Sequence, residues 1–146
     1  MKKMFSQMIN FSLLNHAKRL AMAVVFLSFA TIARAGWSGN ATMKVGVTST
    51  GGGTVYVSTD KTATSGEMSA TDNVSDSDTN ADFFLFATPN SEDYSFAGWF
   101  TDEAGTTSAT LSGTTTPTGK GDKHTLTGSS STKNPTQTFY AKFKHV

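Results

Sequence analysis

The acidic segment of residues 76–82 offers the most recognisable metal ligands in the sequence. It places Asp76, Asp78, Asn80 and Asp82 at alternate positions. Oxygen ligands with this spacing are typical of calcium-binding loops, but an EF-hand loop needs Gly at its sixth position and Glu at its twelfth. This chain has Ala81 and Ala87 there. We therefore interpret the segment mainly as a solvated acidic loop, keep weak calcium binding by these four residues as the alternative, and otherwise expect no metal.

Residues that could support nucleophilic catalysis are few. After residue 35 the histidines are His124 and His145, cysteine is absent, and no G-x-S-x-G or H-E-x-x-H motif occurs. His124 lies in a polar stretch typical of a solvated loop, and the spacing of the Glu and Asp residues does not favour a glycosidase pair. We expect no enzymatic activity and no cofactor.

The first 35 residues have the three regions of a secretory signal peptide. A basic start at Lys2 and Lys3 is followed by a second basic pair and by the uncharged apolar run of residues 20–32. Ala33-Arg34-Ala35 then supplies a small-x-small cleavage site. We predict a signal-peptide helix over residues 1–35 with cleavage after Ala35, a retained anchor being the alternative. The product is expected to be secreted or displayed at the cell surface, or periplasmic if retained.

Removing this segment changes the sign of the net charge. Residues 36–146 contain seven lysines, no arginine and eleven acidic residues, which gives 7 − 11 = −4 in place of the +1 of the whole chain. Nucleic acids and anionic membranes are bound mainly by clusters of Lys and Arg. We therefore expect no nucleic-acid partner and no membrane insertion after cleavage, which leaves an extracellular protein or a glycan as the partner.

Residues 36–146 are expected to form a single, mainly β domain built on a small antiparallel sheet with long polar loops. Its size suits one core, and without cysteine that core must be stabilised by packing alone. Alternation of apolar and polar residues, or apolar runs of strand length, predict strands over residues 43–48, 54–58, 82–88, 94–100, 123–127 and 138–144. The first two resemble a hairpin closed by Gly51-Gly52-Gly53. Residues 60–81 are predicted to be a loop.

The same alternation assigns side chains to the core or to the surface. The expected core residues are Val45, Val47, Val55, Val57, Phe83, Leu85, Phe96, Trp99, Phe139 and Phe143. Tyr56, Phe84 and Tyr140 alternate with them and are therefore candidates for ligand contact. Phe96 and Trp99 fall on opposite faces of an ideal strand, unless Gly98 marks a bulge.

Four motifs in a fixed order resemble the internalin B-repeat, also called the Listeria-Bacteroides repeat. They are Gly53-Thr54-Val55, Ala87-Thr88-Pro89, Phe96-Ala97-Gly98-Trp99-Phe100 and Thr138-Phe139-Tyr140-Ala141-Lys142-Phe143. The similarity covers about residues 43–144 and is closest to the divergent form of the repeat, in one copy and with a long Thr-rich insertion after Gly105. It implies a compact β-grasp-like module of bacterial surface proteins.

Three non-catalytic functions are consistent with these observations. The resemblance implies adhesion, protein–protein contact or a structural spacer. Carbohydrate binding is the first alternative, because exposed aromatic rings in a flat row can stack on sugar rings. A surface-fibre subunit, which would exchange strands with its neighbours, is the second.

Overall fold

The computed structural model describes residues 36–146, and its regular structure consists of strands. Trp37–Val146 form one compact unit, and the predicted signal peptide lies outside the described residues. The strands are β1 (Ser38–Val47), β2 (Gly53–Ser58), β3 (Ser69–Ser75), β4 (Asn80–Pro89), β5 (Tyr94–Phe100), β6 (Lys120–Thr127) and β7 (Thr136–His145). Within residues 36–146 the structure has no helix that could cross a membrane. The prediction of a mainly β domain is confirmed.

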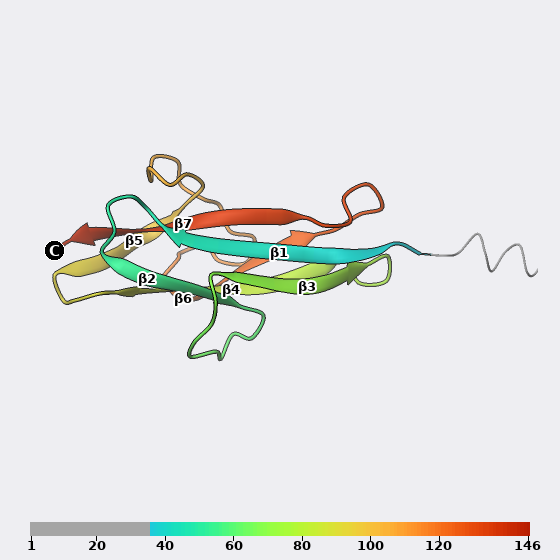
Figure 1. The fold of residues 1–146 in the computed structure, drawn as a ribbon, viewed down its shortest axis with the longest axis horizontal. Helices are drawn as coiled ribbons and strands as arrows, with labels where there is room; N and C mark the ends of the chain where they lie inside the picture. Colours follow the sequence, from blue (N-terminus) through green and yellow to red (C-terminus); the bar gives the residue numbers. More distant parts are fainter. Residues whose placement is uncertain (1–35) are drawn as a thin grey trace, which may run out of the picture. The chain divides into compact units, whose positions relative to one another are not determined.

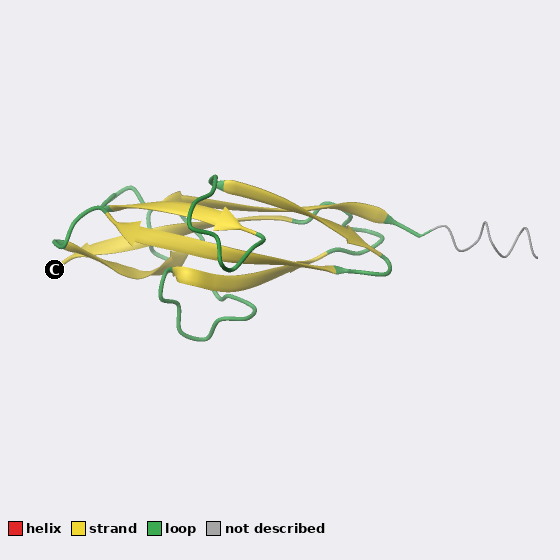
Figure 2. Ribbon diagram, turned by 90° about the horizontal axis from the view of Figure 1, so that it is seen from below, coloured by secondary structure: helices red, strands yellow, loops and turns green. Residues whose placement is uncertain are grey.

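The strands form two sheets that face each other (Figures 1 and 2). One, here called sheet A, has the order β3-β1-β7-β5, and the other, sheet B, has the order β2-β4-β6. All pairings are antiparallel except that of β1 with β7, which is parallel. We predicted one antiparallel sheet from the sequence, whereas the molecule has two sheets, one of them mixed.

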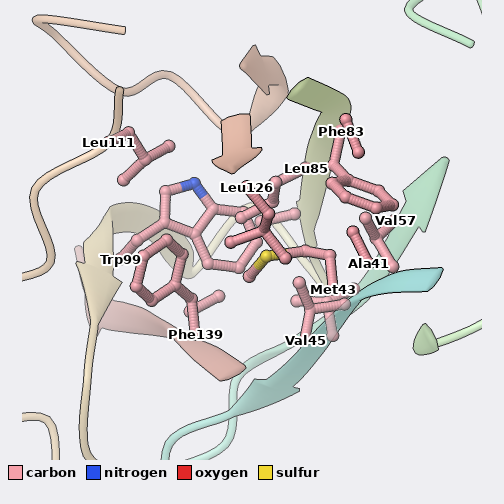
Figure 3. Close-up of a cluster of buried hydrophobic side chains, with 14 of the residues drawn as sticks. Ala41, Met43, Val45, Val57, Phe83, Leu85, Trp99, Leu111, Leu126 and Phe139 are labelled. Carbon is pink, nitrogen blue, oxygen red and sulfur yellow. The ribbon is translucent and has the colours of Figure 1, made fainter. Parts of the chain in front are cut away.

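Alternating side chains from both sheets fill the space between them (Figure 3). In β4 the buried residues are Ala81, Phe83, Leu85 and Ala87, so every second side chain points inward. The expected core residues all belong to this cluster or pack against it. Val47 and Phe96 are only partly buried, and the others are buried. Because successive side chains of a strand point to opposite faces, a period-two pattern gives each sheet one apolar and one wet face.

A bulge at Gly98 brings Phe96 and Trp99 to the same face of β5. The register against β7 shifts between Phe96 and Gly98, and Gly98 has φ of 137°, a conformation that L side chains rarely adopt. The two rings meet edge to face with their centroids 5.4 Å apart. The bulge is therefore the physical reason that two aromatic residues three positions apart share one core.

Two local predictions are wrong. Residues 60–81 are not all loop, because β3 pairs with β1 along one edge of sheet A. This strand carries no apolar pattern, since only Val74 is buried. The runs that become β1 and β2 do not form a hairpin either, because β2 pairs with β4 in the other sheet. Gly51 and Gly52, with φ of 65° and 99°, do provide the reversal, but the chain changes sheets there.

Candidate functional site

The acidic segment proposed for calcium does not come together as a metal site. Asp76 lies in the tight turn between β3 and β4, where the backbones of Ser75 and Asp78 bond each other at 2.9 and 3.2 Å. Asn80 and Asp82 instead accept hydrogen bonds from Thr127 and Thr125 of β6. Asp82 also faces the Lys123 ammonium at 3.4 Å. Among residues 36–146, no group of three acidic or His side chains is arranged to hold a metal ion.

The three aromatic candidates for ligand contact lie on opposite faces of the domain. Tyr56 and Phe84 alternate with buried residues of sheet B and point outward from it, whereas Tyr140 points outward from sheet A, with its ring against Gly46. All three are half-buried. They therefore do not form the single flat row of rings that would favour a carbohydrate-binding surface.

Tyr56 also supports a loop of its own chain. Its ring stacks on Phe86, with centroids 4.5 Å apart and planes 8° apart. Its hydroxyl donates to the carbonyl oxygen of Ala63 at 3.0 Å, so residues 59–66 lie over the outer face of sheet B. Phe86, which sequence reasoning had not assigned, completes this support.

The polar segment between β5 and β6, residues 101–119, is the most elaborately anchored part of the surface. It begins with a turn organised by Asp102, whose carboxylate accepts from the Thr106 and Thr107 backbone amides and from the Thr106 hydroxyl. The Thr106 hydroxyl, followed by the Thr107 and Thr106 amides, lowers the pKa of Asp102. Lys142 of β7 donates to the carbonyl oxygen of Gly105 at 3.1 Å, which ties the turn to sheet A. We call residues 101–119 the anchored loop.

A buried carboxylate holds the end of the anchored loop. Asp122 is 4% exposed and accepts three hydrogen bonds, from the Thr118 amide at 2.9 Å, the Gly119 amide at 2.7 Å and the Trp99 indole at 2.8 Å. Since Trp99 belongs to sheet A and Asp122 to sheet B, this one carboxylate joins both sheets and the loop. Charge-assisted bonds of this kind are roughly twice as strong as neutral ones.

A buried imidazole holds the middle of the anchored loop. His124 is 6% exposed and packs at 4.8 Å from the Phe139 ring. Its Nδ1 accepts the Ser112 amide at 3.0 Å, and its Nε2 lies 2.9 Å from the Gln137 side-chain oxygen. An amide can only donate and a carbonyl oxygen can only accept, so His124 is neutral with its proton on Nε2. Burial lowers the pKa of His124 below its ordinary range, although the bond to Gln137 opposes this shift.

Two hydroxyls attach the anchored loop to the open edge of β6. The Ser112 hydroxyl accepts from the Thr125 amide at 2.8 Å and donates to the same residue's carbonyl at 3.1 Å. The Thr114 hydroxyl bonds Lys123 in the same way, at 2.7 and 3.1 Å. Side chains thus take the place of a neighbouring strand along this edge.

The anchored loop surrounds a shallow, open hollow of about 530 Å³. Its lining consists of Ala109, Thr110, Leu111, Gly113, Thr114, Thr115 and Pro117. None of these side chains is charged. The hollow therefore presents hydroxyls and apolar groups, which suits a neutral ligand.

The hydrogen bonds of Asp122 and His124 indicate that these two buried polar side chains hold the anchored loop in position. A buried carboxylate or imidazole is costly unless it is fully hydrogen-bonded, and here their partners are largely groups of the anchored loop. Every buried side-chain nitrogen and oxygen within residues 36–146 has a partner. Sequence reasoning placed His124 in a solvated loop, but it is buried in β6. The alternation of Asp122, His124 and Leu126 was the available signal.

The fold and the anchored loop together define a cysteine-free, two-sheet β domain with a prearranged surface loop. No family model, curated protein or solved structure matches this chain. The resemblance to the internalin B-repeat accordingly stays a prediction.

Proposed function

We propose that this protein is an exported, non-catalytic contact module that binds an extracellular protein through the anchored loop. The observation that carries the proposal is the burial of Asp122 and His124 to fix a loop whose hollow is lined by uncharged side chains. Loops positioned by a rigid scaffold carry recognition in many folds. A prearranged loop also loses less conformational entropy on binding than a mobile one.

The chemistry of the hollow indicates which class of partner it suits. With the hydroxyls of Thr110 and Thr115 beside Leu111 and Pro117, the surface suits a neutral polypeptide segment that supplies backbone hydrogen bonds and small apolar side chains. Because no lining side chain is charged, binding is expected to depend little on salt concentration. A carbohydrate ligand is the competing outcome, and the outward rings of Tyr56 and Phe84 are where it would bind.

The test is a binding screen of residues 36–146, which contain their own core, against a panel of purified extracellular proteins and a glycan array. Thr110 and Thr115 are both exposed and line the hollow, so Thr110→Arg and Thr115→Arg each place a bulky charge in it. Thr88→Arg, at an exposed position on sheet B, is the matched control.

The expected result is a protein ligand whose binding is lost in both hollow variants, unchanged in the control and insensitive to added sodium chloride. A glycan signal abolished by Tyr56→Ala or Phe84→Ala, with no effect of the hollow variants, would replace the proposal with carbohydrate binding. If no protein or glycan in the panel binds, the contact function has no support, and the domain would then be a spacer.

A further inference from the structure

The four edge strands of the two sheets differ in how the chain itself covers them. The edge of β6 is bonded by the Ser112 and Thr114 hydroxyls. At β5 the end of the edge is covered by residues 107–109, since Thr101 donates to Thr107 and Ala109 donates to Trp99. The edge of β2 is covered in part by Glu67, whose carbonyl accepts the Val57 amide at 3.0 Å.

The edge of β3 has no comparable cover within residues 36–146. The Val45 amide donates to the Met68 carbonyl, so by the antiparallel alternation Ala70, Asp72 and Val74 direct their backbone groups toward β1. Ser69, Thr71 and Asn73 therefore direct theirs away from the sheet. Among these outward amides, only that of Asn73 has a hydrogen bond, which it donates to the neighbouring Asp72 carboxylate at 2.9 Å. The Asp72 side chain is exposed, so it can turn away from the Asn73 amide when another strand approaches.

We propose that β3 is a self-association site, at which a second copy of this chain adds its own β3 in antiparallel orientation and extends sheet A across the pair. The inference goes beyond the proposed function, because it uses a different surface from the anchored loop. Addition of a strand to an exposed edge is a common mode of recognition, in which backbone bonds supply the affinity.

The sequence of β3 is self-complementary in one register. Pairing centred on Thr71 places Thr71 opposite Thr71 of the second copy, and Ser69 opposite Asn73. All of these residues have outward-directed backbone groups, so they form hydrogen-bonded pairs. Asp72 then lies opposite Ala70, and no like charges face each other.

The nearest alternative register is disfavoured by charge. Pairing centred on Asp72 overlaps more residues but places two Asp72 carboxylates directly opposite each other, which is destabilising. Asp72 is thus the residue that selects the register centred on Thr71.

An exposed apolar side chain beside this edge supports the same partner. Met68 precedes β3 and is 58% exposed, one of two large hydrophobic side chains within residues 36–146 that are exposed to this degree. The shared area is small, so the association is expected to be weak in solution and effective where tethering at a surface raises the local concentration.

A charge exchange at Thr71 tests both the site and the register. Its side chain is exposed and bonds the Thr42 hydroxyl at 3.3 Å, so a longer polar side chain fits without disturbing the core. In the register centred on Thr71, Thr71→Lys places two lysines opposite each other and Thr71→Glu places two glutamates opposite each other. Thr88→Lys and Thr88→Glu, on the outer face of sheet B, are the matched controls.

Sedimentation equilibrium of residues 36–146 is expected to show an apparent mass that rises toward twice the monomer mass with concentration. Thr71→Lys and Thr71→Glu alone should remain at the monomer mass, an equal mixture of the two should associate again, and the Thr88 variants should behave as the unchanged protein. A monomer at every concentration, or association that persists in both single Thr71 variants, would overturn the proposal.

Discussion

Asp122 is the one acidic residue among the buried residues of the described part of the chain. Its two oxygens accept three N–H groups, one from Trp99 of β5 and two from the anchored loop. Replacing it with asparagine keeps one acceptor and turns an N–H₂ group toward N–H donors. We expect Asp122→Asn to lower the free energy of unfolding by about 2 kcal/mol, because at least one buried donor loses its partner.

Urea unfolding followed by Trp fluorescence measures this loss. The control is Asp82→Asn, which removes the exposed pair with Lys123. Surface pairs contribute about 0–1 kcal/mol, so this control should change stability little. Equal effects of the two substitutions would contradict the anchoring role of Asp122.

His124 should make the stability of the domain depend on pH. Burial lowers the pKa of His124 in the folded protein, so the unfolded chain binds a proton more readily. Stability is therefore fully present above the unfolded pKa of about 6.5 and is lost progressively as pH falls through the lower folded value. The expected observation is a decrease in the urea midpoint between about pH 7.5 and about pH 5.5.

A His124→Gln variant should lose most of this pH dependence, whereas His145→Gln, at an exposed position, should keep it. Protonation of Nδ1 also removes the acceptor of the Ser112 amide, so the anchored loop should loosen over the same range. A pH profile unchanged by His124→Gln would show that another group is responsible.

At the scale of the strand, the bulge in β5 places both Phe96 and Trp99 against the core. A Cβ added at Gly98 would have room, because the nearest atom is a ring carbon of Phe100 at 3.7 Å, but the φ of 137° strains any L side chain. Gly98→Ala should therefore cost roughly 3 kcal/mol from backbone strain alone. Thermal or urea unfolding measures this loss in the free energy of unfolding.

The matched control for the bulge is Gly51→Ala in the turn after β1. Gly51 also has positive φ, at 65°, with nothing near its Cβ position. That region is less forbidden to side chains, so we expect a loss of only about 1 kcal/mol. A Gly98→Ala variant as stable as Gly51→Ala would mean that β5 can lose the bulge without displacing Phe96 or Trp99.

The hydroxyl contacts along β6 predict a local change in amide exchange. Thr114→Val keeps the shape of the side chain but removes the oxygen that bonds the Lys123 amide. One hydrogen bond of about 1 kcal/mol corresponds to roughly fivefold faster exchange at that amide. Thr115→Val, in an exposed neighbour, should leave the exchange of Lys123 unchanged. No difference between the two variants would place the protection of β6 elsewhere.

The strands that could be predicted from the sequence are those with one apolar face. β7 was predictable because alternation assigns Phe139 and Phe143 to the core, and β4 because residues 83–87 form an apolar run of strand length. β3 was not, because as an edge strand it buries little and carries no apolar pattern. The distribution of strands between two sheets depends on long-range pairing, such as that of β1 with β7, which local patterns do not encode.

The candidate site was less predictable than the core for a related reason. Asp122 and His124 are polar residues at inward positions, and although they alternate with Leu126, the polar composition of residues 120–124 favoured a solvated loop. What identifies them is the hydrogen bonds from the Ser112, Thr118 and Gly119 amides of the anchored loop, which no sequence motif marks. The bulge at Gly98 was the one tertiary feature that the sequence offered as an explicit alternative.

The whole domain combines an apolar core with two polar loops that side chains from sheet B help to hold. Residues 59–66 rest on Tyr56, and the anchored loop rests on Asp122 and His124. Both loops gain order from bonds to the scaffold rather than from regular structure of their own. This arrangement is what the proposed contact function rests on.

Export itself is a prediction about the whole chain that cleavage can test. If residues 1–35 are a signal peptide, protein recovered from the periplasm or medium of a bacterial host should begin at Gly36, because Ala33 and Ala35 satisfy the small-x-small requirement. Ala35→Asp should block cleavage and leave the full chain in the membrane fraction, whereas Arg34→Gln, which keeps both alanines, should be processed normally. N-terminal sequencing and intact-mass measurement distinguish the two. Full-length chain in the membrane fraction of the unchanged protein would identify the segment as a retained anchor, and the domain would then act while tethered to its own cell.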